Sequence, residues 1–278
     1  MTLCMAALCQ DQDAGPAAVV AADRMVTYGG FIEFEHTVPK MAYTSPFTVA
    51  LIAGDTLLGT RLAQGVAAEF SGTAPRVDEI AERVAERYVD TRNAELENQI
   101  LALRGLTKDE FYARHASLNV QVTMLLDQAM AQYNLGIELL VAGVDAAGAH
   151  VYSIHNPGRP ARQHDVIGYA AIGAGGIHAL QAMIGFRHSP SAGLRETVFR
   201  AYAAKRRAEA APGVGLDTDM AVVSASGVRF LGASALQGLA TLYENYGKVA
   251  EAAQAEGLSR LSLEENGSGH DDESGSAG

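Results

Sequence analysis

The sequence predicts an α+β fold, because strand-like and helical stretches come in separate runs along the chain. Apolar, β-branched stretches separated by turn residues fill the first 53 residues. Helical periodicity follows from about residue 57, and strands return near residue 137. Two helices, a hairpin and a last helix complete the order, which favours layered sheets and helices over alternating strand–helix–strand units.

The strands are predicted from apolar runs bounded by turns. Residues 2–9 are mostly apolar, and the polar turn QDQDAGP separates them from a second apolar run, AAVVAADRM, which indicates a hairpin. A further hairpin is expected between Phe31 and Ala53. Later strands are expected at 137–145, 149–158 and 165–173, with a tight hairpin over 218–232.

The helices are predicted from a spacing of about four between apolar residues. Ile80, Val84 and Tyr88 share one face of a predicted helix, with Glu and Arg elsewhere. Thr107 and Glu110 have the spacing of a capping box, which marks the start of another helix. Helices are expected at 57–70, 77–105, from 107, and at 120–134, 175–184, 194–210 and 234–255.

Charge and cysteine content narrow the function classes. The chain has 21 Lys and Arg against 32 Asp and Glu, a net charge of −11, which disfavours nucleic acid as a main partner. The basic run Lys205-Arg206-Arg207 is expected on a helix surface. Cys4 and Cys9 should lie on opposite faces of a strand, as core residues without a disulfide, although Cys4 could sit near a site at Thr2. Without a signal-like start or a long apolar run, we expect a cytoplasmic chain that does not bind membranes.

Thr2 is a candidate nucleophile. An α-amine has an ordinary pKa of about 7.7 to 8.0, so an N-terminal Thr carries its own base. Met1 precedes a small side chain and is expected to be trimmed, which would expose the Thr2 amine. Such a hydroxyl needs a nearby cation, and a buried cation needs a carboxylate. Lys40 and Asp23 are the candidates for these two roles.

The chain resembles the proteasome β-subunit family and its bacterial proteasome-like relatives, which are N-terminal nucleophile hydrolases. The resemblance rests on Thr2, on VVAADRMVTYG with Asp23, and on Lys40 in PKM. It also rests on VALIAGD, which ends at the oxyanion-hole glycine position, Gly54, and on YAAIGAGG. It implies a four-layer αββα sandwich over residues 1–263 with an extra helical insertion at about 94–134. The residues 264–278 are expected to be a disordered acidic tail.

The resemblance also implies the role of each residue. Thr2 would attack a peptide carbonyl, Lys40 would lower the amine pKa and position the hydroxyl, and Asp23 would hold Lys40. The Gly54 N–H would stabilise the oxyanion. Thr27 would bind the substrate main chain as an added strand. An apolar first specificity pocket, suited to cleavage after hydrophobic residues, would be lined by Val26, Val38, Ala42, Ile52 and Thr56.

A threonine peptidase acting on peptides inside a homo-oligomeric ring is therefore the expected function, with no cofactor and no metal. An unfoldase or activator is left open as a further partner. Two departures from the family pattern keep alternatives open. Ala174 lies between Gly173 and Gly175, where the family has Ser, and Glu209 takes the place of a supporting Asp. The alternatives are an inactive proteasome-like scaffold and an amidase acting on a small amide.

Two weaker patterns point elsewhere. The glycine-rich segment 173–176 resembles a phosphate-binding loop, but His178 stands where a dinucleotide-binding glycine would be, so nucleotide binding is not expected. His150, His155 and His164 have no recognisable metal-ligand spacing.

Overall fold

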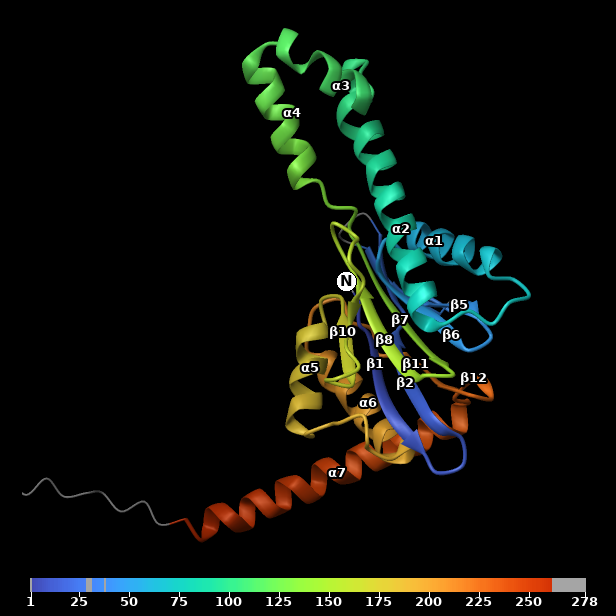
Figure 1. Ribbon diagram of the computed structural model, residues 1–278. Helices are drawn as coiled ribbons and strands as arrows, with labels where there is room; N and C mark the ends of the chain where they lie inside the picture. The colour runs from blue at the N-terminus through green and yellow to red at the C-terminus, as the bar shows by residue number, and fades with distance from the viewer. Residues whose placement is uncertain (1, 29–31, 38, 262–278) are drawn as a thin grey trace, which may run out of the picture. The chain divides into compact units, whose positions relative to one another are not determined.

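The structure is a computed structural model that describes residues 2–28, 32–37 and 39–261. It divides into two compact units, Met1–Leu236 and Gln237–Gly278. The first unit contains two five-stranded antiparallel sheets and the helices that pack on them (Figure 1). Within the described ranges, no helix is both long and apolar enough to cross a membrane.

The first sheet is built around the N-terminal hairpin. β1 pairs with β2 from Cys4 opposite Ala22 to Asp11 opposite Gly15, as the apolar runs and the polar turn between them predict. In spatial order the strands are β10 (Tyr169–Ile172), β1 (Cys4–Asp11), β2 (Gly15–Asp23), β11 (Thr218–Ser224) and β12 (Gly227–Phe230). The predicted C-terminal hairpin is thus β11 and β12, and it adds to the β2 edge.

The second sheet carries the strands that follow β2 and the helical region. Its order is β5 (Met41–Ser45), β6 (Thr48–Gly54), β7 (Ile137–Asp145), β8 (Gly148–Ile154) and β9 (Arg162–Gln163). A separate two-stranded sheet contains β3 (Met25–Tyr28) and β4 (Ile32–Glu35). The sequence does not predict the short strand β9, which has only two residues and no apolar run.

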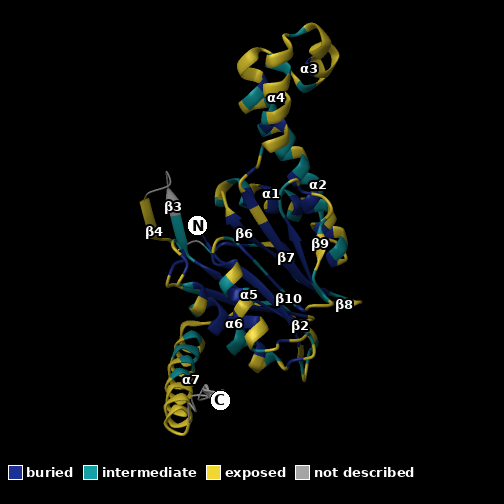
Figure 2. Cartoon of the chain, turned by 90° about the vertical axis from the view of Figure 1, so that its left-hand side faces the viewer, coloured by how far each residue is buried: buried dark blue, intermediate teal, exposed yellow. Residues whose placement is uncertain are grey.

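The two sheets face each other across a core of small and aliphatic side chains. Alternate residues of β1 and of β6 point into it, including Cys4, Ala6, Val49 and Leu51. The opposite faces of these strands are buried as well, so β1, β2 and β6 are apolar at nearly every position (Figure 2). Burial on both faces explains why these antiparallel strands lack the usual alternation of polar and apolar residues.

Helices cover the outer face of each sheet. α1 (Thr56–Glu69) and α2 (Val77–Leu96) contact β5 to β8. The predicted face of α2, with Ile80, Val84 and Tyr88, is fully buried against this sheet. On the other sheet, α5 (Gly176–Gly185) and α6 (Leu194–Ala208) contact β10, β1 and β2. Within this unit the layers therefore follow the order helices, sheet, sheet, helices.

The helical insertion extends beyond the sheets of the first unit (Figure 1). α2 runs on into a π-helical turn, Glu97–Leu101, and a 3-10 turn, Ala102–Arg104. After these come α3 (Lys108–Arg114), a 3-10 turn at His115–Ser117 and α4 (Val120–Gln132). The capping box is present, because the Glu110 N–H donates to the Thr107 hydroxyl and the Thr107 N–H to the Glu110 carboxylate. A small core of its own joins Leu96, Leu101, Phe111, Leu126 and Met130.

The last helix, α7 (Ala233–Ser259), begins at the end of the first unit and forms most of the described part of the second. The acidic segment 264–278, which the sequence predicts to be disordered, lies outside the described residues.

Both cysteines are buried, free and on opposite faces of β1, as predicted. Cys4 lies in the core between the sheets and its thiol donates to the Ile52 carbonyl at 3.4 Å, while the Cys9 thiol donates to the Ala17 carbonyl at 3.6 Å. Burial raises the pKa of both thiols to about 12. Thiols with such a pKa form little thiolate near neutral pH and are poor nucleophiles.

We therefore expect both cysteines to resist alkylation in the folded protein. Iodoacetamide at pH 8 should leave the native mass unchanged, and it should add two groups when the chain is unfolded in denaturant. A singly alkylated native protein would contradict the burial of one of the two thiols.

Candidate active site

Three polar side chains from separate segments meet at the start of β1. Thr2 precedes β1, Asp23 ends β2, and Lys40 directly precedes β5. The hairpin explains the first two positions, because its pairing continues beyond β1 and the Asp23 N–H donates to the Leu3 carbonyl at 3.1 Å. All three side chains are buried: Thr2 is 3% exposed, Asp23 0% and Lys40 3%.

The three side chains form one hydrogen-bonded cluster. The Thr2 hydroxyl donates to Asp23 Oδ1 at 2.5 Å and accepts a hydrogen bond from Lys40 Nζ. Lys40 Nζ also donates to Asp23 Oδ1, at 2.9 Å. The Thr2 oxygen therefore lies between a buried cation, which can stabilise negative charge on it, and a buried carboxylate, which holds that cation in place.

Asp23 is held by backbone donors as well. Its Oδ1 accepts the Leu3 N–H at 2.8 Å, and its Oδ2 accepts the N–H groups of Met25 at 3.0 Å and Gly215 at 2.9 Å. Burial raises the pKa of Asp23, but Lys40, the Thr2 hydroxyl and the backbone donors outweigh it, so the pKa is lower than usual. The carboxylate is consequently ionised at neutral pH and orients Lys40.

Gly54 ends β6 beside this cluster. Its φ is +94°, and a Cβ there would lie 1.9 Å from the Gly136 carbonyl oxygen, so only glycine fits. The Ile52 N–H donates to the Lys40 carbonyl at 3.0 Å. Because strand N–H groups alternate in direction, the Gly54 N–H points to the same edge of β6 as that of Ile52. That edge faces the segment that carries Lys40.

A tight turn between β10 and α5 packs on the Thr2 backbone. Gly173 has a φ of +81°, and a Cβ there would lie 2.3 Å from the Thr2 carbonyl oxygen. The Gly175 N–H donates to this same oxygen at 3.1 Å. The Gly173 N–H donates to Glu138 Oε2 at 2.7 Å, which ties the turn to β7. Ala174, at the tip of the turn, is exposed and brings no hydroxyl to the site.

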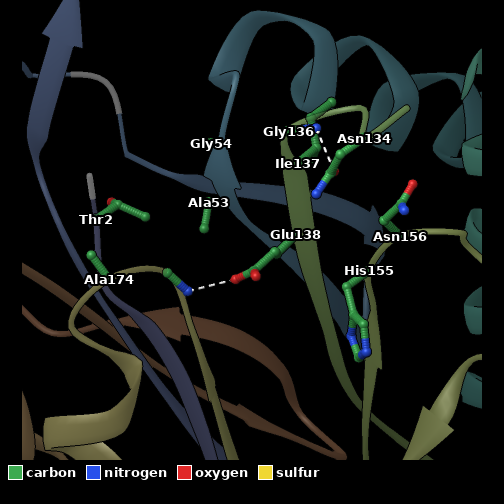
Figure 3. A pocket seen from close by; sticks show the side chains of 11 residues that line it. Thr2, Ala53, Gly54, Asn134, Gly136, Ile137, Glu138, His155, Asn156 and Ala174 are labelled. Carbon is green, nitrogen blue, oxygen red and sulfur yellow. Dashed lines mark hydrogen bonds between the residues drawn. The ribbon is translucent and has the colours of Figure 1, made fainter. Parts of the chain in front are cut away.

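A cavity of about 610 Å³ opens beside Thr2 (Figure 3). Thr2 and Ala174 lie on one side of it. Gly173, and Ala53 and Gly54 at the end of β6, also line it. Glu138 on β7 and His155 after β8 lie across from Thr2. The hydroxyl of Thr2 thus has an adjacent space in which a substrate can lie.

The residues expected for the first specificity pocket are not among those that line this cavity. Ile52 is buried between β6 and the helices α1 and α2, and Ala42 packs against the same core. Thr56 begins α1, and Val26 lies in β3. None of these four lines the cavity beside Thr2. Thr27 pairs with Glu33 in the sheet of β3 and β4, and Val38 lies outside the described residues.

The expectation that Lys205 lies on a helix surface is wrong. Lys205 is 0% exposed. Its burial is compensated by two hydrogen bonds, which Nζ donates to Glu209 Oε1 at 2.6 Å and to the Leu216 carbonyl at 2.5 Å. Burial lowers the pKa of Lys205 despite the compensating carboxylate of Glu209. Glu209 is therefore connected to Asp23 through Lys205. Lys205 binds the Leu216 carbonyl, and the N–H of the preceding residue, Gly215, binds Asp23.

Sequence reasoning missed Glu138 and Lys205, although both carry a recognisable signal. Glu138 is the one charged residue within the apolar stretch Ile137–Val144 of β7. Lys205 follows the buried run 201–204 of α6 and has Glu209 one turn further along the helix. A charged residue inside an otherwise buried periodic pattern is worth considering as a site residue.

No protein-family model matches the chain, and no curated protein matches its sequence.

In the ranges that the structure describes, no group of three or more His, Cys, Asp or Glu side chains could hold a metal ion. The histidines bond elsewhere: His150 Nδ1 lies 2.6 Å from Asp165, and His164 Nε2 lies 2.8 Å from the Ser153 hydroxyl. The functional assignment therefore depends on the geometry around Thr2.

Proposed function

We propose that this chain is an N-terminal threonine peptidase, similar to the proteasome β-subunits, in which Thr2 is the nucleophile. The observation that carries the proposal is the buried cluster in which the Thr2 hydroxyl accepts a hydrogen bond from Lys40 and donates one to Asp23. The proposal requires that the peptide bond before Thr2 is cleaved, which creates the free amine. The four layers of the first unit are consistent with an N-terminal nucleophile hydrolase fold.

The chemistry follows from the charges in the cluster. The lowered pKa of Asp23 makes it a poor base, so the free amine of Thr2 accepts the hydroxyl proton. Thr2 Oγ bonds to the carbonyl carbon while Lys40 stabilises the charge on Oγ. The Gly54 N–H donates to the carbonyl oxygen as it gains charge. The C–N bond then breaks, the leaving amine takes the proton, and water hydrolyses the remaining ester.

Assembly into a homo-oligomeric ring is part of the proposal. The helical insertion supports it, because several large apolar side chains there are well exposed: Leu103 at 78%, Val120 at 71%, and Met124 and Leu125 at 67% each. Exposed apolar side chains gathered on one segment mark interaction surfaces.

The decisive experiment measures intact mass before and after incubation with a peptide epoxyketone. This electrophile reacts with both the amine and the hydroxyl of an N-terminal Thr. We expect the measured mass to match a chain that begins at Thr2, and we expect one adduct that maps to Thr2. The Thr2→Ala variant is the control and should give no adduct and no peptide hydrolysis.

An inactive scaffold is the competing function, and one observation favours it: Ala174 brings no hydroxyl to the turn beside Thr2. A chain that begins at Thr2 but forms no adduct would support the scaffold. A chain that keeps a residue before Thr2 when folded and assembled would exclude the peptidase.

A further inference from the structure

The cavity beside Thr2 has one acidic side chain in its lining. Glu138 projects from β7 towards the turn that carries Gly173 and Ala174 (Figure 3). The lining also includes His155, and no Lys or Arg lines the cavity. A substrate group that enters this space therefore meets a negative charge.

Glu138 is held at the cavity wall by a backbone donor rather than by an ion pair. Its Oε2 accepts the Gly173 N–H at 2.7 Å, which fixes the carboxylate at the cavity wall. Among the described residues Glu138 forms no ion pair, in contrast to Asp23, which pairs with Lys40. The carboxylate thus keeps acceptor capacity for a further donor.

The position of the cavity indicates which part of a substrate it takes. Thr2 and Gly54 border it, so it adjoins the reacting carbonyl. In the proposed peptidase, the residues assigned to the side chain before the cleaved bond do not line this cavity, so we assign it to the leaving-group side. A second cavity of about 510 Å³ shares Glu138 and His155 and adds an apolar wall that includes Tyr169 and Leu180, together with the cationic Arg162. The space therefore continues away from Thr2.

We propose that this cavity is the subsite for the residue directly after the cleaved bond, and that Glu138 selects Lys or Arg there. The proposal rests on the proposed peptidase function. A long cationic side chain suits the space, because its methylene stem can lie along the apolar wall while its charged end pairs with Glu138. Opposite charges a few Å apart in a partly enclosed cavity attract more strongly than in open solvent, and like charges repel.

The test compares internally quenched peptides that differ only in the residue after the cleaved bond: Arg, Gln or Glu. In the wild type we expect kcat/KM for the Arg peptide to exceed that for the Glu peptide about tenfold. The Glu138→Gln variant should bring this ratio close to one. Gln keeps an oxygen that can accept the Gly173 N–H, and a general loss of activity cancels in the ratio.

Asp90→Asn is the matched control. Asp90 is exposed on α2, away from the cavity, so this variant removes one negative charge and should keep the wild-type ratio. A wild-type Arg-to-Glu ratio of kcat/KM near one, or a tenfold ratio that persists in Glu138→Gln, would overturn the subsite. Adduct formation at Thr2 would still support the peptidase in either case. Absence of both the adduct and hydrolysis in the wild type would overturn both proposals.

Discussion

The Lys40→Met variant is expected to lose peptide hydrolysis and about 3 to 5 kcal/mol of the free energy of unfolding. Lys40 and Asp23 are 3% and 0% exposed, and their ion pair is 2.9 Å long. Removing the cation leaves the Asp23 charge buried with only the Thr2 hydroxyl and backbone donors as partners. The Thr2 oxygen loses its only charged donor in the cluster at the same time. Urea unfolding and epoxyketone labelling measure the two effects.

The cost of Lys40→Met should shrink on acidification. In the wild type, Asp23 has a lowered pKa, so its contribution to stability is present above the ordinary Asp pKa of about 3.9. That contribution is lost as the pH falls through the lower, folded-state pKa. In Lys40→Met the largest cause that lowers the pKa of Asp23 is gone, so Asp23 contributes less stability that acidification could remove. The two unfolding free energies should therefore approach each other below pH 4.

Lys248→Met serves as the control, because Lys248 is exposed on α7 and its removal changes the net charge equally. We expect its stability and its labelling at Thr2 to match the wild type. A Lys40→Met variant that keeps its activity would remove Lys40 from the proposed chemistry, whatever its stability.

The sequence predicts the core of the candidate site because strand order brings it together. Thr2 and Asp23 lie at paired ends of the β1–β2 hairpin, and a hairpin with a known turn fixes which residues are neighbours. Gly54 follows from the family resemblance and has the φ and the close contact that require glycine. These residues depend on local pairing, which a sequence pattern encodes well.

Other features depend on tertiary contacts, so a local pattern can mark a residue as unusual but cannot name its partners. The sequence pattern predicts that Lys205 is part of a surface charge run, but the side chain is buried. Glu209 and the Leu216 carbonyl compensate this burial. Glu138 gains its place in the site from a turn 35 residues further along the chain. The expected specificity residues Ala42 and Ile52 pack against helices, because β5 and β6 are covered by α1 on that face. Alternation along a strand shows which residues share a face, but not which helix or cavity that face meets.

The Lys205→Met variant should be destabilised by about 3 kcal/mol, because it leaves the largely buried Glu209 with only its longer ion pair to Arg206, whose side chain is itself partly exposed. It should also lower the rate at which Thr2 forms an epoxyketone adduct. Without Lys205, the Leu216 carbonyl loses its donor, and the adjacent Gly215 N–H is held less firmly against Asp23. Thermal unfolding and the labelling rate at several pH values measure the two consequences.

A second variant separates positioning from stability. Replacing both members of a buried ion pair by apolar residues often restores stability, so Lys205→Met combined with Glu209→Leu should recover most of the loss. The double variant still lacks the hydrogen bond to the Leu216 carbonyl, so epoxyketone labelling of Thr2 should stay slow. The dependence of the labelling rate on pH should also stay different from that of the wild type. If labelling recovers together with stability, Lys205 only supports the fold. If labelling stays slow in a stable double variant, the buried pair positions the loop that holds Asp23, and through Asp23 the cation beside the Thr2 hydroxyl.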